Sequence, residues 1–210
     1  GKVRINTVVA FGRLHIIPLL NDFFIQYPDI KVELMLNDRS VDLVEEGVDL
    51  AVRMGNLSDS SLVAKRMASS PLVTVASPKY LEQFGTPESA RDLKQHNWIV
   101  FTGLADSHQI EFNQGGNSEV VRVDGNLHTN ISEAVRTALL EGNGICQAPR
   151  WLIGDAIESG DLRIVLPHYD TPTMDISAVY PSGRHLPSKA RLLLDFMTQR
   201  FSDCSVIQSC

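Results

Sequence analysis

The chain has 210 residues, of which 43% are hydrophobic and 21% are charged, as in ordinary folded domains rather than disordered segments. Its 19 lysines and arginines are outnumbered by 25 aspartates and glutamates, which gives a formal charge of −6 with no basic cluster. A surface of this kind does not neutralise a run of phosphates, so this chain is not expected to bind DNA by itself.

The first 36 residues have the pattern of a strand, a helix and a second strand. Residues 2–6 are expected to form the first strand. The helix after it has apolar residues spaced to form one face: Ile16, Leu19, Leu20, Phe23, Phe24 and Tyr27. Pro18 is tolerated only in the first turn of this helix, and Pro28 ends it. Residues 31–36 then alternate apolar and polar side chains, which indicates a strand.

A compact helix-to-strand unit is predicted in the next 19 residues. Ser40 is expected to cap a short helix with Leu43 and Val44 facing inward, and Gly47 to end that helix in the left-handed conformation. Residues 48–52 then form a third strand. Helices and strands that alternate in units this short predict a parallel, doubly wound sheet.

A second unit begins with two predicted strands, at residues 63–67 and 71–76. The helix that follows has a serine cap at Ser77, proline in its first turn at Pro78, and a glycine stop at Gly85. Short strands followed by capped helices repeat the pattern of the first unit.

The second unit continues with strands predicted at residues 98–101 and 119–127. Asn130, followed three residues later by Glu133, predicts a capping box that opens another helix. Residues 145–148 are expected to form the strand after that helix.

The last predicted elements are a strand at residues 173–180 and a helix opened by Pro187, with four residues facing inward: Leu186, Ala190, Leu193 and Met197. If this strand rejoins the first sheet, the chain crosses between two lobes twice, near residues 74–77 and 174–177. The predicted fold is α/β, with two doubly wound Rossmann-like lobes joined by two crossover hinge strands. Lobe I is assigned to residues 1–74 and 174–203, lobe II to residues 75–173, and a tail to residues 204–210.

The stretch from Asn37 to Gly55 resembles the effector-binding domain of LysR-type transcriptional regulators, where a helix ending Glu-Glu-Gly and then Asp-Leu-Ala-Val-Arg follow the second strand. The likeness continues through residues 57–66. It extends to about residues 2–201 through further matching motifs: Pro18-Leu19-Leu20, Tyr27-Pro28, Gly142-Asn143-Gly144-Ile145, Pro149, Trp151-Leu152-Ile153, Gly160-Asp161-Leu162 and Pro167.

This resemblance implies a fold like that of type 2 periplasmic binding proteins. It also implies that a winged helix-turn-helix, the part of the full-length regulator that contacts DNA, is absent from this chain. Domains of this family pair side by side and antiparallel, so a homodimer, a homotetramer or a larger ring is expected.

Ligands of open parallel sheets sit beyond the carboxyl ends of the strands, where helix N-termini favour anions. The helix starts at residues 7–9 and at Asn130 would suit a carboxylate. LysR-type domains hold effectors at these edges, so the resemblance implies binding roles for the following residues: Thr7, Val8, Val9, Asn37, Asp38, Arg39, Arg53, Phe101, Thr102, Gly103, Asn130 and Gln147.

Simpler interpretations of these residues stay open. Thr7 and Asn130 can serve only as helix caps, and Arg53 can pair with Asp38 or Asp49. Phe101 can belong to the core, and residues 37–39 can form no more than a turn.

The sequence predicts no enzyme, cofactor or metal site. It lacks the glycine-rich phosphate and dinucleotide loops and the nucleophile elbow, and its six histidines are scattered.

The three cysteines leave two interpretations open. Cys146 is either a redox-sensing thiol, as in some regulators of this family, or a buried strand residue; Cys204 and Cys210 lie in the polar tail. An odd number of cysteines fits a reducing compartment. With no predicted membrane helix or secretory leader, we expect a soluble, cytoplasmic protein unless a leader has been removed.

The function predicted from these observations is effector sensing and oligomerisation for a LysR-type regulator. A small anionic metabolite would bind between the lobes and alter the DNA-binding geometry of the oligomer. The alternative is a two-lobed solute-binding protein for transport, which would share the fold but carry a secretory leader.

Overall fold

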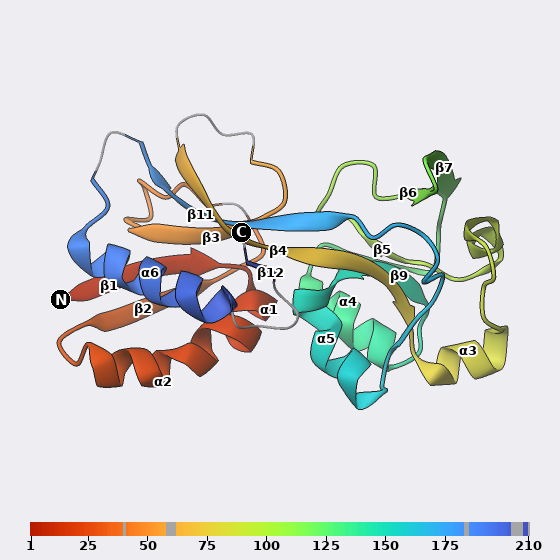
Figure 1. The fold of residues 1–210 in the computed structure, drawn as a ribbon, viewed down its shortest axis with the longest axis horizontal. Coiled ribbons are helices and arrows are strands. Elements are labelled where there is room, and N and C mark those ends of the chain that lie inside the picture. The colour runs from red at the N-terminus through yellow and green to blue at the C-terminus, as the bar shows by residue number, and fades with distance from the viewer. Residues whose placement is uncertain (40, 58–61, 183–184, 203–207, 210) are drawn as a thin grey trace. The chain divides into compact units, whose positions relative to one another are not determined.

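The computed structural model describes residues 1–39, 41–57, 62–182, 185–202 and 208–209 (Figure 1). The chain divides into two compact units, unit 1 with residues Gly1–Ser70 and Met174–Cys210, and unit 2 with residues Pro71–Thr173. It passes from unit 1 to unit 2 within one long strand, β4 (Leu62–Ala76), and returns at the start of β11 (Thr173–Pro181).

Unit 1 is built on a sheet in which the strand order is β4-β11-β3-β1-β2, and a short final strand pairs with β4. Besides β4 and β11 its strands are β1 (Lys2–Thr7), β2 (Lys31–Leu36), β3 (Leu50–Met54) and β12 (Gln208–Ser209). β1 lies between β2 and β3 and runs parallel to both, which is the centre of a doubly wound sheet. β12 brings two residues of the predicted tail into this sheet.

One helical run connects β1 to β2, and it consists of α1 (Val9–Phe11), the π-helical segment η1 (Gly12–Ile16) and α2 (Ile17–Gln26). Pro18 lies in the first turn of α2, as predicted. Phe23 is fully buried, and its ring packs 5.3 Å from that of Phe196 in α6 (Ser188–Ser202). The inward orientation predicted for Phe24 is wrong, because the next residue along a helix points about 100° away from the α6 contact.

The segment between β2 and β3 forms a single capped turn at residues 43–47 and not the predicted helix. Asp42 caps it, since Asp42 Oδ1 accepts from the backbone N–H of Val44 at 2.8 Å and of Glu45 at 3.0 Å. The predicted cap, Ser40, lies outside the described residues. Gly47 has a φ of +61°, which confirms the left-handed stop. Leu43 is buried as predicted, but Val44 is 51% exposed, because the turn ends before it can cover a second residue.

Unit 2 contains the second half of β4 and several short elements that pack around Trp98, Tyr80 and Leu93. Its strands are β5 (Ile99–Phe101), β6 (Gln109–Gln114), β7 (Asn117–Arg122), β8 (Leu127–Thr129), β9 (Ile145–Pro149) and β10 (Arg163–Ile164). Its helices are α3 (Pro78–Phe84), the 3-10 helix η2 (Ala90–Gln95), α4 (Ser132–Leu140) and α5 (Arg150–Ser159). β9 and β10 pair with β4, β5 runs parallel to β8, and β6 and β7 form a hairpin.

Two strand predictions for this part of the chain are wrong in extent. The two strands expected at residues 63–67 and 71–76 are one continuous strand, β4. The strand expected at residues 119–127 is divided into β7 and β8, because the backbone at Gly125 passes directly against Trp98: a Cβ there would lie 1.9 Å from the Trp98 carbonyl oxygen.

The helix caps of unit 2 agree with the sequence at one helix and differ at another. Ser77 caps α3 as predicted, with Ser77 Oγ accepting from the backbone N–H of Tyr80 at 3.2 Å. The capping box predicted at Asn130 is wrong. The N-cap of α4 is Ile131, which offers no side-chain cap, and the Ile131 N–H instead donates to Thr129 Oγ1 at 3.1 Å.

Candidate functional site

The carboxyl ends of the three parallel strands in unit 1 are joined by hydrogen bonds at Thr7. Thr7 is fully buried, and its hydroxyl donates to the Val52 carbonyl oxygen at 3.2 Å. The backbone N–H of Asn37 donates to the Thr7 carbonyl oxygen at 3.1 Å. Thr7 does not cap the following helix, because the N-cap is Val8, in extended conformation, and Val9 is the first helical residue. Thr7 therefore links the ends of the three parallel strands at the edge where a ligand was expected.

Arg53 lies at the end of β3, half-buried, and is held by a buried amide. Its Nη1 donates to Asn6 Oδ1 at 2.6 Å, and Asn6 Nδ2 donates to the Met35 carbonyl oxygen at 3.0 Å. Burial lowers the pKa of Arg53 from its ordinary value. Neither Asp38 nor Asp49, the two partners suggested for it, forms an ion pair with Arg53 among the described residues, and Asp49 Oδ2 accepts from the backbone N–H of Arg4 at 2.9 Å. In the described part of the chain, the hydrogen-bond partner of Arg53 is a neutral side chain.

The three polar residues after β2 form a bend, as the simpler interpretation expected. Asn37 and Asp38 are half-buried, and Arg39 is exposed. Asn37 Oδ1 is buried and accepts no hydrogen bond from the described residues. A buried acceptor of this kind is uncommon in folded proteins, so Asn37 can accept from a ligand donor at this edge.

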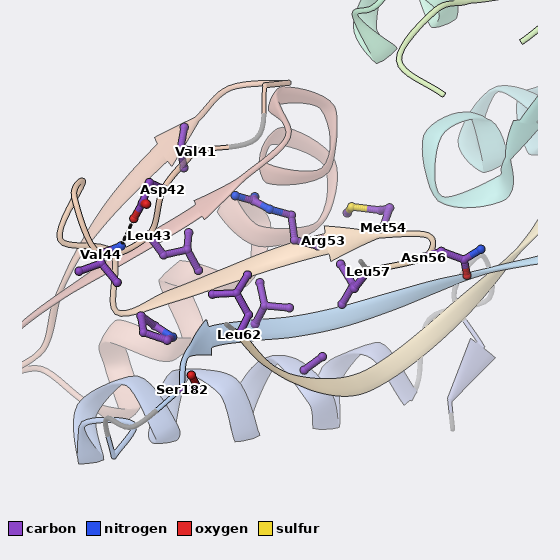
Figure 2. A pocket seen from close by; sticks show the side chains of 13 residues that line it. Val41, Asp42, Leu43, Val44, Arg53, Met54, Asn56, Leu57, Leu62 and Ser182 are labelled. Atoms are coloured by element: carbon purple, nitrogen blue, oxygen red, sulfur yellow. Dashed lines mark hydrogen bonds between the residues drawn. The ribbon is translucent and has the colours of Figure 1, made fainter. Parts of the chain in front are cut away.

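A pocket of about 470 Å³ lies within unit 1, beside Arg53 (Figure 2). Apolar side chains make up most of its wall, and Arg53 and Asp42 are its charged members. The lining residues are Val41, Asp42, Leu43, Val44, Arg53, Met54, Asn56, Leu57, Leu62, Ala64, Val179, Pro181 and Ser182. Except for Arg53, none of these was among the predicted site residues.

Unit 2 brings four of the predicted residues to the end of one strand pair. Phe101 ends β5 opposite Thr129, and the backbone N–H of Thr102 donates to the Thr129 carbonyl oxygen at 2.8 Å. Gly103 lies under the half-buried Phe101 ring, where a Cβ would come within 2.5 Å of the ring. Asn130 follows β8 directly and is exposed. Phe101, Thr102, Gly103 and Asn130 therefore share one edge.

Gln147 lies inside β9 and not beyond its end, so the placement expected from the sequence is wrong. It pairs with Thr74 of β4 and is half-buried. Its neighbour Cys146 is buried, and that burial raises the pKa of the thiol to about 12. A thiol with so high a pKa is poorly reactive, which favours the structural interpretation of Cys146.

The described residues contain no group of three or more histidine, cysteine, aspartate or glutamate side chains able to hold a metal ion. The nearest arrangement is in unit 2, where His128 Nε2 lies 3.2 Å from Asp124 Oδ1 and 3.0 Å from the Gly125 carbonyl oxygen. In the same described part of the chain, every helix is too short or too polar to span a membrane.

Sequence reasoning missed Asn6 and Asp42, the two residues that organise the polar groups of unit 1. Asn6 carried a signal, because an amide stands directly after Ile5 near the end of a strand predicted to be buried. Asp42 followed by Glu45 also has the spacing of a helix start, but Ser40 was chosen as the cap.

Known proteins resemble this chain over nearly its whole length. The family model described as the LysR substrate binding domain matches residues 1–202. An uncharacterised HTH-type transcriptional regulator of Haemophilus influenzae is 33% identical over 189 residues, covering 90% of this chain and 66% of that protein. The HTH-type transcriptional activator TtdR of Escherichia coli is 32% identical over 198 residues, covering 94% of this chain and 64% of TtdR. The chain thus spans about two thirds of these relatives.

Solved structures resemble it as closely. The regulatory domain of CrgA, a LysR-type transcriptional regulator from Neisseria meningitidis, has a TM-score of 0.86 and 28% identity, covering 95% of this chain and 98% of that one. Full-length AphB, a virulence activator of Vibrio cholerae, has a TM-score of 0.79 and 30% identity, covering 95% and 68%. These regulatory domains have the two-lobed fold of type 2 periplasmic binding proteins, which confirms the predicted fold class.

Proposed function

Since this chain belongs to the LysR family of transcriptional regulators as an effector-binding domain, we propose that it senses a small anionic metabolite between its lobes. Binding would favour one hinge angle and so shift the population of conformations of the whole regulator. The direction of the response is left open, because the relatives include both an activator and a repressor.

The anionic character of the effector rests on the start of α4. This helix begins at Ser132 and its N-cap residue, Ile131, provides no side-chain cap, so the positive end of the helix dipole favours an anion beside it. Glu133 in the first turn offsets part of that charge, so polar contacts from Asn130 and Thr102 are needed as well.

We further propose that the regulator acts in the cytoplasm as a homodimer, a homotetramer or a larger ring. It would touch DNA through a winged helix-turn-helix outside this chain. The printed names of the relatives are those of HTH-type regulators, and each is longer than the matched region. The net charge of −6 gives this chain no surface of its own for phosphates.

The test is thermal unfolding of this chain with a panel of small carboxylates and aromatic metabolites. A ligand at a hundred times its dissociation constant adds about 2.7 kcal/mol, which shifts the midpoint of a chain of this size by several degrees. The shift should be lost in Asn130→Ala and kept in Asn126→Ala, which alters another exposed amide of unit 2. A shift that survives Asn130→Ala would reject the assigned site.

The intact regulator provides the second test. Thr7→Ala combined with Asn130→Ala should abolish induction of a reporter gene and leave promoter binding unchanged. Retained induction would contradict the role assigned to these two residues.

A further inference from the structure

Arg53 is a half-buried cation in the wall of the pocket. Among the described residues its hydrogen bond goes to the amide of Asn6, and no carboxylate pairs with its guanidinium. Charged side chains taken out of water are normally paired with an opposite charge. A guanidinium has five N–H donors, so the bond from Nη1 leaves donors for an anion.

The guanidinium is also fixed in place before any ligand arrives. Asn6 is fully buried, and its other amide atom is anchored to the Met35 carbonyl oxygen on β2. An arginine held by a buried and anchored side chain loses little conformational entropy when it binds an anion. Its planar fork matches the two oxygens of a carboxylate.

The space beside Arg53 has the size and lining of a small-molecule site. The volume of about 470 Å³ falls in the range of ligand pockets, and apolar residues, including Leu43, Leu62 and Val179, outnumber polar ones in its lining. Asp42, the acidic residue of this wall, bonds through Oδ1 to the amides of its own turn, as the dashed line to Val44 in Figure 2 shows. These two bonds hold the Asp42 carboxylate on its own turn, so it does not compete with a ligand for Arg53.

We propose that this pocket is a separate site for a small amphipathic monocarboxylate. The carboxylate binds Arg53, and the hydrocarbon part packs against Leu43, Leu62 and Val179. All of its lining residues belong to unit 1. The site therefore requires no residue of unit 2, and Arg53, one of the residues expected to bind the effector, serves this site instead.

The test is titration calorimetry of the whole chain with straight-chain monocarboxylates from four to eight carbons. Each added methylene should tighten binding about fourfold as the hydrocarbon fills the pocket. The primary amide of the same length should bind at least about tenfold more weakly, because it lacks the charge that Arg53 recognises.

Two variants locate the binding. Arg53→Gln should weaken it by about tenfold or more, whereas Arg191→Gln, which removes an exposed arginine of unit 1 that does not line the pocket, should leave it unchanged. Ala64→Phe fills the pocket from an exposed position and should also abolish binding. It provides an independent test if Arg53→Gln disturbs the fold.

Three results would overturn the proposal: absence of saturable binding, equal binding of acid and amide, or unchanged binding in Ala64→Phe. Loss of binding in Asn130→Ala would also overturn it, since the carboxylate would then occupy the effector site proposed above. Retained binding in Asn130→Ala with loss in Ala64→Phe supports a site within unit 1, whatever the outcome of the effector panel.

Discussion

The strand ends of unit 1 and unit 2 differ in how their polar side chains are held. In unit 1, Asn6 and Thr7 are fully buried, and each side chain donates to the backbone of a neighbouring strand. In unit 2, Thr102 and Asn130 are exposed, and the bond between Thr102 and Thr129 is a backbone bond. The first edge is organised by the fold itself, whereas the side chains of the second edge keep rotamer freedom that a ligand can restrict.

This difference separates stability from binding. A buried, hydrogen-bonded residue contributes to folding as well as to a site, so its substitution changes both. An exposed residue at a strand end contributes little to folding, so its substitution reports on the ligand. Unit 1 is therefore the place to measure stability, and the edge of unit 2 the place to measure the effector response.

The first prediction concerns the core of unit 2. The comparison would fail if this core were as accessible to solvent as the edge of the same unit. Cys146 in β9 is buried, and with a pKa of about 12 it carries about a thousandfold less thiolate near neutral pH than an ordinary thiol. We expect a Cys204→Ser, Cys210→Ser variant to react with an aromatic disulfide reagent at least about a thousandfold more slowly when folded than in urea.

Rapid labelling of that folded variant would show that unit 2 opens around β9.

The raised pKa of Cys146 also has a consequence for stability. The folded thiol keeps its proton while the unfolded one ionises near pH 9.0, so the free energy of unfolding should fall as the pH rises above 9.0.

The second prediction compares two glycines. A Cβ at Gly125 in unit 2 would lie 1.9 Å from the Trp98 carbonyl oxygen, and one at Gly12 in unit 1 would lie 2.2 Å from Leu36 Cδ2. The Trp98 backbone cannot move away from a new methyl group, whereas the end of the Leu36 side chain can. Gly125→Ala should therefore lower the free energy of unfolding by about 3 kcal/mol, and Gly12→Ala should change it by less than about 1 kcal/mol.

Urea unfolding followed by circular dichroism measures both glycine variants. Equal losses would mean that Leu36 is held as rigidly as the Trp98 backbone. The Leu36 side chain of unit 1 could then not move aside for a methyl group at residue 12.

The third prediction compares an ion pair from each unit. In unit 2, Arg136 is largely buried and binds Asp155 through two N–H···O bonds of 2.8 Å, whereas Arg200 and Asp22 of unit 1 are both largely exposed. Arg136→Gln should cost about 1–2 kcal/mol after allowance for the exposed carboxylate, and Arg200→Gln less than about 0.5 kcal/mol.

The pair in unit 2 also predicts a pH dependence. Partial burial raises the pKa of Asp155, but the hydrogen bond and positive charge of Arg136 outweigh it, so the pKa is lowered below the ordinary 3.8. The contribution to stability is complete above that ordinary value and is lost as the pH falls through the lowered one. In acid titrations of thermal unfolding, the difference between wild type and Arg136→Gln should narrow below about pH 3.8, leaving the part that comes from the Arg136 bond to the Leu152 carbonyl oxygen; a constant difference down to pH 2 would contradict this.

The smallest effect is expected at the two edges themselves. Thr7→Val keeps the shape of the side chain and removes the bond to the Val52 carbonyl oxygen, which should cost about 1 kcal/mol. Asn130→Ala should change the free energy of unfolding by less than about 0.5 kcal/mol. Urea unfolding in which Asn130→Ala costs more than Thr7→Val would reverse the comparison between the edges.

Elements whose signals are local in the chain were predicted well. The serine cap of α3, the left-handed Gly47 and the Pro18 turn all depend on residues within a few positions, and all are present. The predicted inward orientation of Phe24 was wrong because it depended on where α6 packs. The predicted cap at Asn130 was wrong because a neighbouring hydroxyl, that of Thr129, bonds at the helix start instead.

The candidate site was predicted only in part, because strand ends have local signals in the sequence and contacts between strands do not. The expected ends of β2 and β5 are confirmed, so Asn37 lies directly after its strand and Phe101 ends its own. β1 extends one residue further than expected and includes Thr7, and β3 spans Leu50–Met54 and not residues 48–52, so Arg53 lies inside it. Gln147 was misplaced because β9 extends to Pro149 along its partner β4. The pocket of unit 1 was not predicted, since its wall combines residues 41–64 with residues 179–182.

By itself, the sequence determined the fold class, because hydrophobic periodicity, caps and turn residues act over a few neighbouring positions, and it indicated the family through the resemblance of residues 37–55 to LysR-type domains. The tertiary structure decided which of those residues meet. The bond from Arg53 to Asn6, the partial burial of that guanidinium and the burial of Cys146 arise from contacts between segments far apart in the chain. Such contacts depend on strand register and packing, which no local pattern of residues specifies.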